Sequence, residues 1–233
     1  MIPSEKERKG GTPAFEDDAE AFDAWFADNA NVFESELLAE KHFITDPENT
    51  LSIGCGSGLF EARLGIPRGV EPSEGMAALA RRRGVDVTIG TAENVPCEDE
   101  RFNGVLMGTI LSYVKDRRKA VGEAYRILRH GGHIVVSFLP REGSYALLYD
   151  LAAMKGKFDP ETAPEHPYPI EFIEEGTWCS TREVTDLLND AGFVDLEYVQ
   201  TLTRHPKYTN DSVEEPAKGY DRGDYIVVRG RKP

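Results

Sequence analysis

The feature that most constrains the fold is a glycine-rich turn that follows a short apolar segment. The stretch reads Leu51-Ser52-Ile53-Gly54-Cys55-Gly56-Ser57-Gly58-Leu59-Phe60-Glu61, with three glycines at alternate positions. Glycine lets backbone N–H groups come close to a ligand because no Cβ intervenes, and the start of a helix presents further unpaired donors. The stretch therefore predicts a strand, a tight turn and a helix that together hold a small polar ligand.

A second short strand ends at an acidic residue. Gly69-Val70 leads directly into Glu71. A carboxylate at the tip of the second strand of a βαβ unit is placed to accept hydrogen bonds from the hydroxyls of a ribose. The glycine turn and Glu71 together predict a nucleoside cofactor.

Short apolar segments alternate with helical patterns through the middle of the chain, which predicts a parallel sheet with helices on both faces. We expect strands at 50–53, 68–70, 86–89, 104–107, 133–138, 193–203 and 224–229. The last two strands have no helix between them, so one strand near the edge must run antiparallel. The expected fold class is α/β: a Rossmann-like, doubly wound, seven-stranded sheet, mostly parallel with one antiparallel strand near the edge, and with an N-terminal helical cap.

We expect a single domain over residues 1–233, since this length suffices for one sizeable core. Its expected parts are a flexible tail (1–12), an N-terminal helical cap (13–45), a cofactor-binding core (50–138), a lid or substrate insertion (140–178) and a C-terminal helix with a strand hairpin (181–233). The insertion is dense in proline and aromatic residues, and an irregular segment of this length is usually functional. Residues 204–223 are expected to form a loop, to which the sequence assigns no role.

The composition of the chain argues against several classes of binding partner and identifies none. A net charge of −14 argues against nucleic acid, whose binding needs a cationic surface. The three cysteines share no metal-ligand spacing, so we expect no metal site and a reducing, cytoplasmic setting. The polar N-terminus lacks the apolar core of a signal peptide, and no apolar run is long enough to cross a bilayer, so we expect no membrane partner. A monomer or a homodimer is compatible with this composition.

The spacing of the glycines separates two classes of cofactor. The dinucleotide fingerprint is G-x-G-x-x-G, whereas Gly54, Gly56 and Gly58 form G-x-G-x-G and Leu59 stands at the last fingerprint position. The departure favours a cofactor without a pyrophosphate, such as S-adenosylmethionine. A nicotinamide-dependent oxidoreductase remains the less favoured alternative.

The sequence resembles the class I S-adenosylmethionine-dependent methyltransferases, in the small-molecule branch of type 11-like enzymes. The resemblance covers roughly residues 51–138 and rests on four blocks in order. They are the glycine turn, Gly69-Val70-Glu71-Pro72-Ser73-Glu74-Gly75-Met76, Gly90-Thr91-Ala92-Glu93-Asn94-Val95-Pro96 with the strand after it, and Glu123-Ala124-Tyr125-Arg126-Ile127-Leu128-Arg129-His130-Gly131-Gly132.

The resemblance implies a role for each matching position. The glycines would line the methionine part of the cofactor, Glu71 would take the ribose hydroxyls, and residues 108–110 would lie at the methyl end. Thr91 stands where such proteins often have an aspartate that binds the adenine amino group, so that contact is weakened. The implied cofactor-binding set is Trp25, Ile53, Gly54, Cys55, Gly56, Gly58, Glu71, Pro72, Ser73, Met76, Thr91, Ala92, Glu93, Gly108, Thr109 and Ile110. For Trp25, core packing competes with a role as a lid over the cofactor.

The expected reaction is in-line displacement, in which a small-molecule acceptor takes the methyl group and S-adenosylhomocysteine is released. Such a reaction depends mainly on positioning and on excluding water, and no constellation in the sequence identifies a catalytic residue. Candidate acceptor contacts are Tyr113, Tyr145 and His166, although a tyrosine of this kind is more often plain packing. The other alternative is a protein that binds S-adenosylmethionine without catalysis, which a closed space beside Gly108-Thr109 would support.

Overall fold

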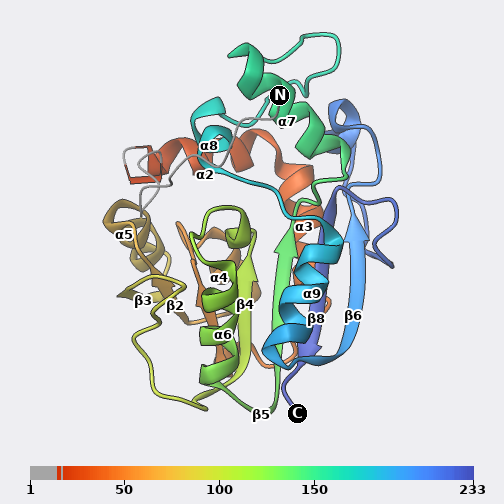
Figure 1. The fold of residues 1–233 in the computed structure, drawn as a ribbon. Coiled ribbons are helices and arrows are strands. Elements are labelled where there is room, and N and C mark those ends of the chain that lie inside the picture. The colour runs from red at the N-terminus through yellow and green to blue at the C-terminus, as the bar shows by residue number, and fades with distance from the viewer. Residues whose placement is uncertain (1–14, 17) are drawn as a thin grey trace.

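The computed structural model describes residues 15–16 and 18–233 (Figure 1). The predicted flexible tail, residues 1–12, lies outside the described residues, as do residues 13, 14 and 17 of the expected cap. Within the described part, no helix is long and apolar enough to span a membrane.

Within the described residues, eight strands form one sheet in the order β3-β2-β1-β4-β5-β8-β6-β7. The strands are β1 (Thr50–Ile53), β2 (Arg68–Glu71), β3 (Asp86–Ile89), β4 (Phe102–Gly108), β5 (Leu128–Phe138), β6 (Val194–Thr201), β7 (Ala217–Lys218) and β8 (Tyr225–Arg231). The pairs among β1 to β5 are parallel, whereas β8 runs antiparallel between β5 and β6. The doubly wound α/β fold with its antiparallel strand near the edge is confirmed.

The sheet differs from the expectation at its far edge. The two-residue strand β7 pairs antiparallel with β6, through Val199 with Lys218 and Gln200 with Ala217. It comes from the segment 204–223, which the sequence predicts as a loop and which also holds a short 3-10 helix, η3 (Pro206–Asp211). A strand this short has too few residues to show the alternation by which strands are recognised.

Eight helices follow the chain order within the described part. They are α2 (Ala19–Asp28), α3 (Ala30–Lys41), α4 (Leu59–Leu64), α5 (Glu74–Arg82), α6 (Arg117–Ile127), α7 (Ser144–Lys155), α8 (Ile170–Glu175) and α9 (Thr181–Ala191), with the 3-10 turns η1 (Pro47–Asn49) and η2 (Ile110–Ser112) between them. Ser73 is the N-cap of α5, since its side chain accepts a hydrogen bond from the Met76 amide. Helix α8 is an addition, because residues 170–175 belong to the insertion that the sequence predicts as irregular.

The sheet carries a core on each face because successive strand residues point to opposite sides. In β4, Val105 and Met107 join the cluster that includes side chains of α6 and α9. Leu106, between them, joins the cluster that includes side chains of α3. The sheet is thus a middle layer between two layers of helices.

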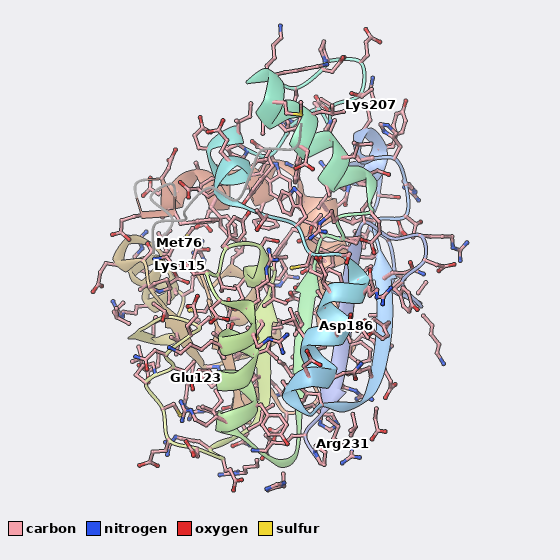
Figure 2. All side chains as sticks on the ribbon, in the orientation of Figure 1. Met76, Lys115, Glu123, Asp186, Lys207 and Arg231 are labelled. Atoms are coloured by element: carbon pink, nitrogen blue, oxygen red, sulfur yellow. The ribbon has the colours of Figure 1, made fainter. Side chains whose placement is uncertain are left out.

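Helices α2, α7 and α8 lie above the upper edge of the sheet, where β4 and β5 end (Figure 1). Met76 and Lys115 lie toward this end, and Arg231 lies toward the opposite end (Figure 2). In open α/β sheets, ligands bind outside the carboxyl ends of the strands. This edge is therefore the place to look for a functional site.

Candidate functional site

The glycine turn follows β1 in the conformation that its sequence predicts. Gly54, Gly56 and Gly58 all have positive φ, at 72°, 52° and 74°, which is strained for residues with a Cβ. The amides of Gly54 and Cys55 donate to the carbonyl of Val70, at 2.7 and 3.2 Å, and join the turn to β2. A Cβ placed on Gly56 would meet nothing within 4 Å, so open space lies beside this residue.

Glu71 lies at the end of β2 with its carboxylate against the turn. Its Oε2 accepts from the Gly56 amide at 2.9 Å, and its Oε1 accepts from the Ser73 amide at 3.0 Å. The side chain is only 6% exposed, and this burial raises its pKa while the two backbone donors lower it. Glu71 therefore joins the glycine turn to the start of α5.

The members of the implied cofactor-binding set that follow Glu71 surround the start of α5, and the N-terminal cap covers them. Met76 is buried and packs in one cluster with Ala19. The Ser73 hydroxyl donates to the Phe15 carbonyl at 3.2 Å. Pro72 occupies the turn between Glu71 and Ser73. Residues of the cap thus close this side of the predicted cofactor site.

Two further predicted segments follow β3 and β4. Thr91 is exposed, Ala92 is buried, and Glu93 accepts from the amides of Lys115 and Asp116 at 2.9 and 3.2 Å, which holds the loop before α6. The fourth strand ends at Gly108 and leads through Thr109, with φ of 51°, into η2 at Ile110.

A cavity lies beyond the carboxyl ends of β1 and β4 and contains about 910 Å³ of space between atoms, its opening to solvent included. Of the site residues predicted from the sequence, those that line the cavity are Trp25, Gly54, Cys55, Gly56, Gly108, Thr109, Tyr113 and Tyr145. Ile53 is instead buried in the core. His166 is exposed and does not line this cavity. Glu71 and the residues after β2 and β3 lie along the same edge of the sheet without lining it.

Trp25 connects the N-terminal cap to the insertion. Its indole Nε1 donates to the carbonyl of His166 at 3.0 Å, and Asn29 Nδ2 donates to the same carbonyl at 3.0 Å. The indole also packs edge-to-face on Tyr168, with ring centroids 5.0 Å apart. Trp25 thus lines the cavity and closes it at the same time.

The cap is also fastened to the glycine turn. Asp23 Oδ1 accepts from the Ser57 hydroxyl at 2.6 Å. Arg83 donates to the other Asp23 oxygen and, at 2.7 Å, to the Ser57 carbonyl. Because this ion pair is partly buried, it is less screened by water than a surface pair.

Several residues that line the cavity are not among those predicted from the sequence. Three are carboxylates, Glu36, Glu40 and Glu61, and six are aromatic, Phe22, Phe26, Phe60, Tyr149, Tyr168 and Tyr225. Glu36 and Glu40 lie one turn apart on the buried side of α3, beside Phe33 and Leu37. The sequence contained one signal for them: the spacing of Glu36 and Glu40 places both acids on the apolar face of the helix.

Burial controls the ionisation of these carboxylates. It raises the pKa of Glu40 to about 7, although hydrogen bonds from Ser137 and Tyr225 oppose the shift. It raises the pKa of Glu61 to about 8, against a hydrogen bond from the Ser52 hydroxyl at 2.7 Å. The pKa of Glu36 is raised well above its ordinary value by burial and by Glu40.

These raised pKa values predict how stability depends on pH. A carboxyl group whose pKa is higher in the folded state binds protons more tightly there, so its contribution to stability is lost as pH rises through the folded pKa. For Glu61, with a folded pKa of about 8, we expect the ligand-free protein to unfold more easily at about pH 8 than at about pH 6. Glu61→Gln should reduce this difference in the free energy of unfolding by about 1–2 kcal/mol, measured by urea titration. Glu34→Gln, at a partly exposed ion pair with Arg63, is the control, and an unchanged pH dependence in Glu61→Gln would contradict the assignment.

Comparisons with known proteins bear on this site. The family model described as a methyltransferase domain matches residues 51–136. A solved structure from Thermotoga maritima, described as an S-adenosylmethionine-dependent methyltransferase and possible histamine N-methyltransferase, is similar at 36% identity and a TM-score of 0.85, over 95% of this chain and 99% of that one.

Sequence relatives extend the similarity. An uncharacterised protein of Methanocaldococcus jannaschii is 30% identical over 94% of this chain and 98% of its own length. A demethylmenaquinone methyltransferase of Symbiobacterium thermophilum is 26% identical over 70% of this chain and 74% of its own length.

Proposed function

Because this chain belongs to the class I S-adenosylmethionine-dependent methyltransferases, we propose that it methylates a small molecule held in the cavity beyond β1 and β4. The enzyme class and the cofactor follow from the family. The small-molecule acceptor and the in-line course of the reaction are the proposal.

The residues around the glycine turn fit the cofactor. The open space beside Gly56 leaves its backbone accessible from the cavity. Glu71, at the end of β2, has two carboxylate oxygens that each accept one backbone hydrogen bond and keep a further lone pair. We propose that Glu71 takes the ribose hydroxyls, that Gly54 and Gly56 face the methionine part, and that Gly108 and Thr109 face the methyl end.

The observation that carries the small-molecule proposal is the continuity of the cavity. It runs from Gly54 and Gly108 at the strand ends to Tyr149 and Trp178, which both belong to the insertion. Helix α2 closes it through the Trp25 contacts. A catalytic protein needs space beside Gly108 and Thr109 for the acceptor, whereas a protein that only binds the cofactor does not need it. The named acceptors of the relatives differ chemically, so the acceptor must be inferred from this cavity.

The chemistry requires little from the protein beyond positioning. Bound S-adenosylmethionine supplies an electrophilic methyl group, which the acceptor takes in line as S-adenosylhomocysteine leaves. The chain's residues orient the two reactants and exclude water: Trp25 and Tyr168 close the cavity, and the Asp23–Arg83 pair holds the cap on the glycine turn.

Broader features of the chain complete the proposal. We propose one domain with the divisions given by the sequence, in which residues 140–178 act as the lid over the acceptor. The charge of −14 supports a protein without a nucleic-acid partner. We also propose that the protein is a cytoplasmic monomer or homodimer without a membrane partner.

Calorimetric titration of the purified protein with S-adenosylhomocysteine, with NADH in parallel, tests the cofactor site. We expect micromolar binding of the first and none of the second. Methyl-labelled S-adenosylmethionine incubated with the protein and a cell extract then tests the acceptor. Label in low-molecular-weight products supports the proposal, whereas label only in protein or nucleic acid contradicts it.

A further inference from the structure

The cavity has an unusual balance of charge. Its lining includes three carboxylates, Glu36, Glu40 and Glu61, and, among the described residues that line it, no lysine, arginine or histidine. A buried carboxylate without a cationic partner is costly to keep ionised. The described residues also hold no group of three or more His, Cys, Asp or Glu side chains placed to bind a metal ion. The wall therefore lacks a cation of its own.

Glu40 is held in place by one of its oxygens only. Its Oε1 accepts from the Ser137 hydroxyl at 2.7 Å and from the Tyr225 hydroxyl at 2.8 Å. Its Oε2 is buried with no hydrogen-bond partner among the described residues, and the side chain is 1% exposed. Since buried polar atoms in folded proteins are almost always paired, the Oε2 atom points to a missing ligand.

The position of Glu40 places that ligand near the methyl end. A Cβ added to Gly108, at the end of β4, would lie 3.2 Å from Glu40 Oε1. The Thr109 amide donates to the Ser137 hydroxyl at 3.1 Å, and that hydroxyl donates to Glu40. One hydrogen-bonded chain thus links Glu40 to the loop at which we propose the methyl group to lie.

Aromatic rings supply the rest of the wall on this side. Tyr149 stacks on Tyr168, with centroids 5.9 Å apart and planes at 24°, and lies 5.6 Å from Trp178. Together with Tyr145 these rings line the cavity. The faces of aromatic rings attract cations, and more strongly away from water. Carboxylates and ring faces therefore favour the same kind of ligand.

We propose that this part of the cavity selects an acceptor that carries an ammonium group, with Glu40 Oε2 and Glu36 as its counter-charges and the tyrosine and tryptophan rings around it. The inference rests on the proposed function and narrows it to amine-bearing small molecules. Glu40 and Glu36 are binding residues in this proposal, and no proton transfer to the reacting atom is assigned to them.

The test compares two matched probes, phenethylamine and phenethyl alcohol, which differ in the cationic group. Each is titrated by calorimetry into the protein saturated with S-adenosylhomocysteine. We expect the amine to bind about tenfold more tightly or better, the usual effect of pairing a buried charge. Glu40→Gln should abolish this preference and still fold, because the amide oxygen keeps the bonds from Ser137 and Tyr225. Glu34→Gln is the control, because it makes the same change toward the outer side of α3, at the partly exposed ion pair with Arg63. This variant should keep the preference for the amine over the alcohol.

A second readout follows the proton on Glu40. The ionisable groups that face it are Glu36 on its own helix, Glu61 on α4 and Tyr225 on β8. At about pH 7 a bound ammonium group should favour the ionised carboxylate, so binding should release protons, seen as a dependence of the binding enthalpy on buffer ionisation heat. Glu40→Gln should remove this dependence. If Glu40 had only a structural role, binding of the amine to the wild-type protein would not release protons from it.

The outcomes separate the two proposals. If S-adenosylhomocysteine binds but the amine has no advantage over the alcohol, or shows no binding up to about 10 mM, the amine inference is overturned and the methyltransferase proposal stands. If Glu40→Gln weakens S-adenosylhomocysteine and spares the amine preference, the carboxylate serves the amino group of the cofactor and the inference is also overturned. If S-adenosylhomocysteine does not bind, the proposed function fails, and the inference fails with it.

Discussion

Gly58→Ala is expected to lower the free energy of unfolding by about 2–4 kcal/mol, as the sum of backbone strain and overpacking. Gly58 has φ of 74°, and a Cβ there would lie 2.8 Å from the Cα of Ala80. That atom is backbone within α5, so it cannot move aside as a flexible side chain would. The close approach of the glycine turn to α5 therefore depends on the missing side chain. Urea unfolding followed by circular dichroism measures the loss.

Gly84→Ala separates strain from packing. Gly84 also has positive φ, 89°, but a Cβ there would meet nothing within 4 Å. Only the backbone penalty of about 1–2 kcal/mol applies to it. Equal losses in the two variants would show that the contact with Ala80 relaxes, and the packing explanation would be wrong.

Glu71→Ala is expected to weaken S-adenosylhomocysteine binding by about 1.5–3 kcal/mol, the usual loss for a hydrogen bond to a charged group. Two effects act in the same direction. The ribose hydroxyls would lose their proposed acceptor, and the amides of Gly56 and Ser73 would lose theirs. Calorimetric titration of the variant against the wild type measures the loss.

Glu74→Ala is the matched control for Glu71→Ala. Glu74 is a carboxylate in the first turn of α5, with a solvent-exposed side chain paired loosely to Arg81 at 3.7 Å. Such pairs contribute little, so the affinity of this variant should equal that of the wild type. An unchanged affinity in Glu71→Ala, with the fold intact, would remove Glu71 from the cofactor site.

Local signals explain where the sequence predicted the fold well. The bounds of β1 and β3 are those expected, because each strand is bordered by turn residues or a glycine close by in the sequence. Helix α9 has a capping box between Ser180 and Glu183 and ends at Gly192 in the left-handed conformation. Such signals involve neighbours in the chain and can be read without knowing the fold.

Helix α8 shows where local signals end. Its six residues carry no side-chain cap, and a short helix is marginal without tertiary contacts. Phe172 is buried there against the rings of Phe15 and Tyr168. Phe15 belongs to the N-terminal cap, so the helix depends on a segment that lies far away in the sequence.

The sequence by itself determined the alternation of strands and helices from β1 to β5, the glycine turn, and a carboxylate at the end of the second strand, because each is fixed by residue types and spacings within a few positions. Only the tertiary structure decided that Glu36, Glu40 and Glu61 line the same cavity as Tyr149, Tyr168 and Trp178. An acid on a helix can face water or the interior, and the pattern of one helix does not say what packs against it. The choice depends on residues from α3, α4, β8 and the insertion meeting at one edge of the sheet, where burial raises the pKa of Glu40 to about 7 and leaves one of its oxygens without a partner among the described residues.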